Sequence, residues 1–336
     1  SEHSDDDDSK GRSASSSATE GGDGGWVIDE LLAYDLQPAQ LQSLRALGFS
    51  IIESRELESL GIAFARLRIP YGMSELEAMQ QLRKLQAEPG AGYELNHIYQ
   101  LNSDPCQGER CFAQHMIDWS VSGPGSCPSS IRIGMIDTAV DQRHAGLNTS
   151  ALQSKNFAVS GKPSETIHGT AVAGLLAGSS QQGSYGLLPC AQIYAADVFQ
   201  TARQGKSHTT AALIAEGIDW LVSQQVHVIN ISLAGPANKL LEKSISAAHE
   251  LDSPIVAAAG NNGPDAEPAF PAAYKEVIAV TAVDARLRLY ARANRGQYIS
   301  LSAPGVRVWA PSAQGGEYQS GTSFAAPFVS AAVACL

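Results

Sequence analysis

Three residue types in this sequence, a serine, a histidine and an aspartate, stand in contexts that suit nucleophilic catalysis. Ser323 follows Gly321 and Thr322 and precedes small apolar residues, which predicts a tight turn that delivers the serine to the first turn of a buried helix. There the unpaired backbone N–H groups and the positive end of the helix dipole favour an alkoxide or an oxyanion. Pro327 is expected at the end of that first turn, where its missing N–H costs little.

The base and its orienting carboxylate are expected at His168 and Asp137. Asp137 closes the apolar run 131–136, and His168 stands directly before a predicted helix. In a set of this kind the histidine takes the serine proton, and the aspartate holds the imidazole in the right tautomer. Each residue also has a structural alternative: a helix cap or turn residue at Asp137, a structural histidine at His168, and a Thr-capped core helix around Ser323.

The elements that must position these residues predict an α/β fold. Runs rich in Val, Ile and Ala alternate with two helical segments, 209–223 and 238–251. This alternation predicts a mostly parallel, doubly wound sheet, in which ligand sites gather at the carboxyl ends of the strands. Asp137, Ser232 and Asn261 all stand at or just after such ends. The expected strands are 131–136, 191–199, 226–233, 254–260 and 277–283.

Four short motifs resemble the subtilase family of serine proteases, and they occur in the order Asp, His, Asn, Ser that the family uses. The resemblance covers roughly residues 128 to 336 and implies a subtilisin-like doubly wound sheet for that part. The motifs are Ile136-Asp137-Thr138, His168-Gly169-Thr170 with Ala173-Gly174, Ala258-Ala259-Gly260-Asn261, and Gly321-Thr322-Ser323 with Ala325-Ala326-Pro327.

The resemblance implies roles for the matching residues. Asp137, His168 and Ser323 would form the catalytic triad of a serine endopeptidase, and the Asn261 amide would bind the oxyanion together with the Ser323 N–H. An ordinary turn is the alternative at Asn261, because Asn-Asn-Gly-Pro is strong turn sequence. Two segments would form the walls of the main specificity pocket and pair with an extended substrate, namely Ser232, Leu233, Ala234 and Gly235 on one side and a wall containing Ala258 and Gly260 on the other.

Some features depart from the family pattern. Ala139 and Ala234 stand where glycine is usual, which predicts a slightly trimmed substrate groove, and 204–207 is expected as the groove's other edge. The loop 178–183 lacks the longer insertion that binds calcium in some members, so no cofactor is expected and calcium has no clear site. Because family catalytic domains continue well past the nucleophile, the part 128–336 is expected to be C-terminally incomplete.

A smaller domain is predicted before the catalytic part, at residues 26–103. Its strands and helices follow the order β-α-β-β-α-β, a ferredoxin-like arrangement, with Ser74 capping the second helix. Placed directly before a subtilase domain, it resembles the family's inhibitory propeptide, which would make it an intramolecular inhibitor. By that resemblance the extended tail from 96–101 onward would lie in the substrate cleft, and self-cleavage would fall between about Tyr99 and Trp119.

The remaining segments are expected to be a tail and a linker. Residues 1–25 are acidic and rich in Ser and Gly, so they are predicted to be disordered, and 104–127 form the linker. Cys106 and Cys111 in the linker either close a local disulfide in an oxidising compartment or stay a free pair. The propeptide resemblance implies a secreted or periplasmic protein, although the chain shows no signal sequence.

Composition narrows the partners. The chain has 336 residues and a formal net charge of −11, and it has no basic cluster of the kind that binds nucleic acid. It has no apolar run of about 18 residues, so no membrane span is predicted. The expected partner is therefore a protein or peptide substrate. The alternative function is a non-catalytic or permanently propeptide-inhibited homologue that acts as a binding partner.

Overall fold

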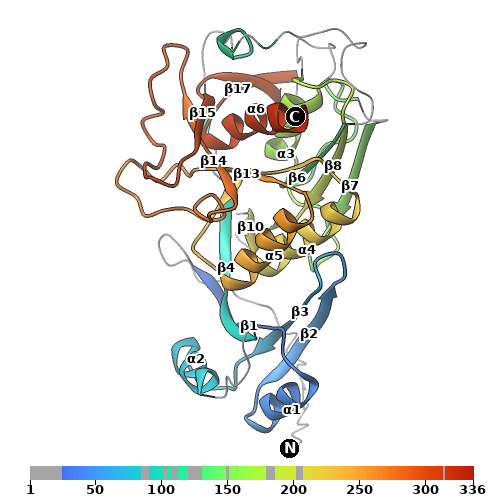
Figure 1. Ribbon diagram of the computed structural model, residues 1–336, viewed down its shortest axis with the longest axis vertical. Coiled ribbons are helices and arrows are strands. Elements are labelled where there is room, and N and C mark those ends of the chain that lie inside the picture. Colours follow the sequence, from blue (N-terminus) through green and yellow to red (C-terminus); the bar gives the residue numbers. More distant parts are fainter. Residues whose placement is uncertain are drawn as a thin grey trace, which may run out of the picture.

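The computed structural model shows two packed parts joined by one long strand (Figure 1). It describes residues 25–84, 91–101, 104–106, 113–117, 119, 131–148, 151–178, 186–201, 207–312 and 315–336. The expectations for the tail 1–24, for Cys111 and for the loop 179–185 lie outside the described residues.

The N-terminal part is a four-stranded antiparallel sheet with strand order β2-β3-β1-β4 and two helices. Its element order is the one that the sequence predicts. The elements are β1 (Trp26–Tyr34), α1 (Pro38–Ala46), β2 (Ser50–Leu57), β3 (Ile62–Arg68), α2 (Glu75–Arg83) and β4 (Gly92–Leu101). Ser74 caps α2 as predicted: its hydroxyl accepts from the Glu77 N–H, and the Glu77 carboxylate accepts from the Ser74 N–H.

The two faces of this sheet bury different partners, because successive side chains of a strand point to opposite faces. Leu31 and Ala33 pack with residues of α1 and α2. Leu32 and Tyr34 instead join the core that contains α4 (Ala211–Ser223) and α5 (Lys239–Glu250). The N-terminal sheet therefore lies between its own helices and two helices of the C-terminal part, as Figure 1 shows.

The C-terminal part contains a sheet of order β15-β14-β13-β11-β6-β8-β7, in which all described neighbours are parallel. Helices α4 and α5 cover one face, and α3 (Ile167–Ala177) and α6 (Thr322–Ala334) cover the other (Figure 1). The predicted doubly wound α/β sheet is thus confirmed. The strands are β6 (Arg132–Asp137), β7 (Leu152–Asn156), β8 (Gln192–Asp197), β11 (Val228–Ile231), β13 (Ile255–Ala258), β14 (Val277–Val283) and β15 (Leu301–Pro304).

Short elements surround the main sheet. Strand β4 leaves the N-terminal sheet and pairs with β10 and β12 of the C-terminal part, so it belongs to both parts (Figure 1). Strands β16, β17 and β5 form a separate antiparallel sheet. These elements are β5 (Asp104–Cys106), η1 (His115–Ile117), β9 (Gln200–Thr201), β10 (Ser207–Thr210), β12 (Leu233–Ala234), β16 (Val308–Ser312) and β17 (Gly315–Ser320).

Candidate active site

Asp137 and His168 form a short hydrogen-bonded pair. Asp137 ends β6 at the carboxyl edge of the parallel sheet, and His168 lies in the first turn of α3. His168 Nδ1 is 2.6 Å from Asp137 Oδ1, which also accepts from the Thr138 N–H at 2.7 Å. A carboxylate at Nδ1 favours the tautomer that carries its proton there, which leaves the lone pair on Nε2. His168 Nε2 has no hydrogen-bond partner among the described residues, so it is available as a base.

Ser323 lies in the first turn of α6, as predicted, and is fully buried. Helices α3 and α6 pack on the same face of the sheet, and this packing brings the histidine close to the serine. The His168 ring centroid lies 5.3 Å from that of Phe324, the residue that follows Ser323. The Ser323 hydroxyl donates to the Ser232 carbonyl at 3.3 Å.

Asn261 follows β13 and faces the start of α6. Its Oδ1 accepts from both the N–H and the hydroxyl of Thr322, each at 3.1 Å. These two donors fix the orientation of the amide, because only the oxygen can accept. Its Nδ2 has no partner among the described residues and remains a donor next to the residue that precedes Ser323.

Strand β4 covers one of the two predicted pocket walls. Leu233 and Ala234 pair antiparallel with Leu101 and Gln100, so this segment offers a backbone edge to an extended strand. Gly235, the last residue of the predicted wall, exchanges backbone hydrogen bonds with Phe270. The edge at β12 is therefore two residues long in the described structure.

The second predicted wall has a different environment. Ala258 ends β13 and pairs with β14, so its backbone lies inside the main sheet and presents no edge to β4. Gly260 has a φ of +106°, and a Cβ there would lie 2.8 Å from Asn294 Nδ2. Glycine is thus required at this position by both conformation and space.

A second strand edge pairs with β4 just after the predicted segment 204–207. Residues 204–206 are outside the described part, and Ser207 pairs with Thr201 rather than with β4. Thr209 and Thr210 form the edge, because they pair with Tyr99 and Ile98 of β4. Threonine-rich strand ends have no distinctive sequence signal, and only the tertiary pairing identifies these two residues.

Ser232, predicted as part of the first wall, has a fully buried side chain that donates to the Ser323 carbonyl at 3.0 Å. One predicted placement needs correction. Pro327 was expected in the first turn of α6, but α6 begins at Thr322, so Pro327 lies in the second turn. Its missing N–H therefore falls where the helix would normally use one.

Comparison with known proteins identifies the family. The profile of the subtilase family matches residues 129–336, which is more than half of the chain. The chain belongs to the subtilase family. Subtilisin DY of Bacillus licheniformis is 33% identical over 228 residues, which cover 64% of this chain and 80% of that protein. Subtilisin E of Bacillus subtilis (strain 168) is 31% identical over 226 residues, which cover 63% of this chain and 56% of that protein.

A solved structure shows the same fold. Fervidolysin from Fervidobacterium pennivorans, described as a keratinolytic enzyme related to subtilisin, matches with a TM-score of 0.74 at 21% identity. The match covers 95% of this subtilase and 55% of that chain. The present chain therefore spans about half the length of that protein. It likewise covers 56% of the length of several of the subtilisins that it matches.

Asp197 is a site neighbour that sequence reasoning missed in this subtilase. It ends β8 in parallel register with Asp137 and is buried. Its carboxylate accepts from the Ser164 N–H at 2.9 Å and from the Ser164 hydroxyl at 2.7 Å, and burial raises its pKa. Ser164 in turn accepts from the Ala139 N–H at 2.9 Å, so the pair supports the loop after Asp137. The available signal was an acidic residue inside the otherwise largely apolar predicted strand 191–199.

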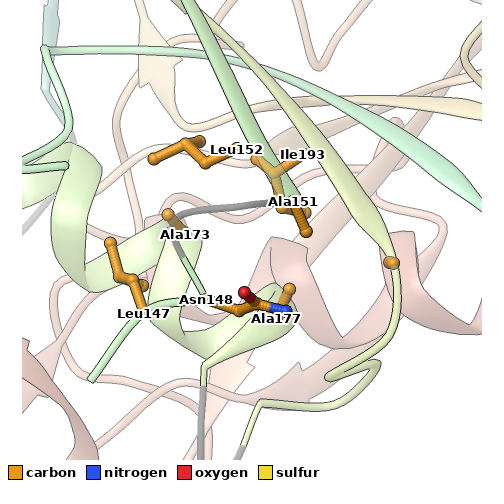
Figure 2. Close-up of a pocket in the computed structure, with 8 residues that line it drawn as sticks. Leu147, Asn148, Ala151, Leu152, Ala173, Ala177 and Ile193 are labelled. Carbon is orange, nitrogen blue, oxygen red and sulfur yellow. The ribbon is translucent and has the colours of Figure 1, made fainter. Parts of the chain in front are cut away.

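A pocket away from the predicted site residues lies in the described part of this subtilase. The pocket in Figure 2 lies beside α3, β7 and β8 and contains none of the predicted site residues. Its lining is apolar except for Asn148 and consists of Leu147, Asn148, Ala151, Leu152, Ala173, Ala177, Ala191 and Ile193. Within the described ranges, no group of three or more His, Cys, Asp or Glu residues gathers as metal ligands would, and no helix has the length and apolarity to cross a membrane.

Proposed function

We propose that this chain is the proenzyme form of a secreted subtilisin-like serine endopeptidase. The observation that carries the proposal is the gathering of the Asp137–His168 pair, Asn261 and Ser323 at the start of α6, next to a groove that holds β4. Family membership supports hydrolysis of peptide bonds in proteins as the reaction.

In the proposed mechanism Ser323 Oγ attacks the peptide carbonyl carbon. His168 Nε2 takes the hydroxyl proton and later gives it to the leaving amine, while Asp137 holds Nδ1 and stabilises the imidazolium. The short Nδ1 contact of 2.6 Å supports this division of roles. Asn261 Nδ2 and the Ser323 N–H donate to the oxyanion, and Thr322 holds the amide in the donating orientation beforehand.

The N-terminal part acts in this proposal as the inhibitory propeptide. Strand β4 binds between β10 and β12 as an extended substrate would, with main-chain pairing on both sides. Polar contacts hold the rest of the domain to α4. Arg55 forms an ion pair with Glu216, and Asp219 Oδ1 accepts from the Ser59 and Leu60 N–H groups at 2.7 and 3.1 Å.

We place self-cleavage within the segment from Leu101 to Asp104. Strand β4 ends at Leu101 on β12, which directly follows Ser232. Strand β5 begins at Asp104, which pairs with Ser320, three residues before the nucleophile. The end of β4 and the start of β5 thus pair with segments that directly follow Ser232 or closely precede Ser323, and the proposal assigns cleavage to the stretch between these two strand ends.

Secretion is supported by covalent chemistry as well as by family. Cys190 is disulfide-bonded, and such bonds persist in oxidising compartments outside the cytosol. Cys335 is a free cysteine.

The test is intact mass of the purified full chain over time. We expect the wild type to split once within Leu101–Asp104, and Ser323→Ala to stay whole because it has no nucleophile. Ser223→Ala is the matched control, since Ser223 is an exposed serine at the end of α4 and should leave cleavage unchanged. A folded wild type that neither splits nor cuts a peptide ester would instead favour the inhibited or non-catalytic homologue.

A further inference from the structure

One carbonyl oxygen of α6 lacks the donor that a helix normally supplies. In an α-helix the carbonyl of each residue accepts from the N–H four residues later. For Ser323 that residue is Pro327, which has no N–H. Because Ser323 is fully buried, its carbonyl must find a donor outside the helix backbone.

Ser232 provides this donor, and two further side chains fix it. The Ser232 hydroxyl donates to the Ser323 carbonyl at 3.0 Å. Asn230 Nδ2 donates to Ser232 Oγ at 2.9 Å, and the Ser330 hydroxyl donates to Asn230 Oδ1 at 2.9 Å. All of these side chains are fully buried. Since the Asn230 amide has one donating and one accepting end, its orientation leaves the Ser232 hydrogen directed at Ser323.

The chain of hydrogen bonds ties the nucleophile to the central sheet. Asn230 lies on β11, next to β6 and β13, whereas Ser330 lies on α6 about two turns beyond Ser323. The Ser323 carbonyl belongs to the peptide that joins Ser323 to Phe324, and Phe324 packs against the His168 ring. A rotation of this peptide would therefore move the serine relative to its base.

We propose that Ser232, Asn230 and Ser330 are positioning residues that replace the hydrogen bond lost at Pro327 and so hold Ser323 in register with His168. We call these three side chains the relay. The inference rests on the proposed function, because it assigns the relay a role in that reaction. None of the three side chains is required to touch the substrate or the reacting atoms.

The decisive experiment is a double-mutant cycle between Ser232 and Pro327. Ser232→Ala removes the donor, so we expect kcat to fall about tenfold with KM within about twofold. Pro327→Ala restores an N–H at the correct helical position. In the Pro327→Ala background the same Ser232→Ala change should cost less than about threefold, because the helix now supplies the bond.

Hydrolysis of a peptide substrate and the rate of self-cleavage are both measured for the wild type, the two single variants and the double variant. Equal losses from Ser232→Ala in the two backgrounds, in an enzyme that is active, would overturn the positioning role and leave the proposed function intact. An inactive wild type would overturn the proposed function. In that case the positioning role in catalysis is overturned as well. Failure of the positioning role alone and failure of the proposed function therefore give different results.

The outer end of the relay has its own control. Ser330→Ala should lower kcat about threefold without changing KM, because Asn230 loses the partner that fixes its amide. Ser244→Ala removes an equally buried hydroxyl in α5, which donates to the Leu240 carbonyl of its own helix at 3.0 Å. An equal loss of kcat in Ser244→Ala would show a general stability effect and contradict the relay.

Discussion

At the scale of single residues, the site depends on side chains whose second functional atom is already occupied. Asp137 holds His168 Nδ1, so Nε2 is the nitrogen that can act as base. Thr322 holds Asn261 Oδ1, so Nδ2 is the atom that can donate. In both cases one hydrogen bond decides the orientation of a polar group before any substrate arrives, which is the arrangement that lowers reorganisation in a reaction.

Asn261→Leu tests this arrangement. In the proposed mechanism the change removes an oxyanion donor at nearly constant volume. We therefore expect kcat to fall about 100- to 1,000-fold, the range known for removal of the corresponding amide in a subtilisin. KM should change little. Steady-state kinetics on a peptide substrate measures both constants.

The neighbouring Asn262 is the matched control. Its side chain is exposed, and its backbone N–H, which bonds to Asn294, survives substitution. Asn262→Leu should therefore keep kcat. If Asn261→Leu also keeps it, the amide has no part in binding the oxyanion.

At the scale of elements, the loop after β13 contains Asn261 and, close to it on either side, two glycines with positive φ values. The two glycines have different surroundings. Gly260 and Gly263 have φ values of +106° and +109°. A Cβ at Gly260 would meet Asn294 and Ala269, whereas a Cβ at Gly263 would meet nothing within 4 Å. Substitution of each glycine in turn therefore separates the effect of backbone strain from the effect of steric crowding.

Alanine at either glycine should cost about 1–3 kcal/mol of unfolding free energy through strain. Only Gly260→Ala should also lower kcat, because the added methyl pushes against Asn294 and shifts the loop that holds Asn261. Urea unfolding and kinetics on both variants check this. Equal kcat values in the two variants would mean that the loop tolerates the shift.

The elements also show what the sequence can predict. Apolar runs and their punctuation located the ferredoxin-like element order and the five inner strands of the parallel sheet, because strand period and helix caps are local signals. The two edge strands β7 and β15 were missed, since they are short and partly exposed and lack a long apolar run. The edge at Thr209 and Thr210 was missed, since it exists only through pairing with β4, far away in the sequence. The predicted position of Pro327 within its helix was wrong, because the sequence does not fix a helix start to within a few residues. The exact start nevertheless decides which carbonyl loses its N–H donor.

At the scale of the whole molecule, the interface between the two parts buries ionisable groups with opposite responses to pH. Burial raises the pKa of Glu216 from 4.5 to about 7 despite its ion pair with Arg55. Burial lowers the pKa of His97 from 6.5 to about 4, and His97 Nδ1 lies 3.2 Å from Asn238 Nδ2. Both groups would regain ordinary pKa values if the N-terminal part left.

The signs follow from linkage. Glu216 favours retention of the N-terminal part fully below pH 4.5, and this contribution is lost as pH rises through about 7. His97 favours retention above pH 6.5, and its contribution is lost as pH falls through about 4. Between these limits the two contributions oppose each other.

Variants at the two positions should separate these contributions. We expect Glu216→Gln to retain the N-terminal part better than wild type at pH 7 to 8, because glutamine stays neutral where Glu216 ionises, and then to lose it steadily on acidification through the His97 response. His97→Asn should instead retain it better than wild type near pH 4, because asparagine cannot take up the proton that His97 binds on release. Native mass spectrometry of the self-cleaved complex from pH 4 to 8 measures the retained fraction. Identical profiles for both variants and the wild type would contradict this assignment.

Strand β4 is shared by the two parts, and in the proposed proenzyme this sharing makes inhibition depend on the volume that the molecule occupies. While the chain is whole, the tether keeps β4 at a high effective concentration beside its groove, whatever the dilution. A cut after Leu101 need not disturb any strand pairing, yet it turns a tethered segment into a ligand that dilution can remove. In the proposed function the molecule would stay inhibited in the confined compartment where it is made. It would become active on reaching a larger volume, and no second protein would be needed to release it.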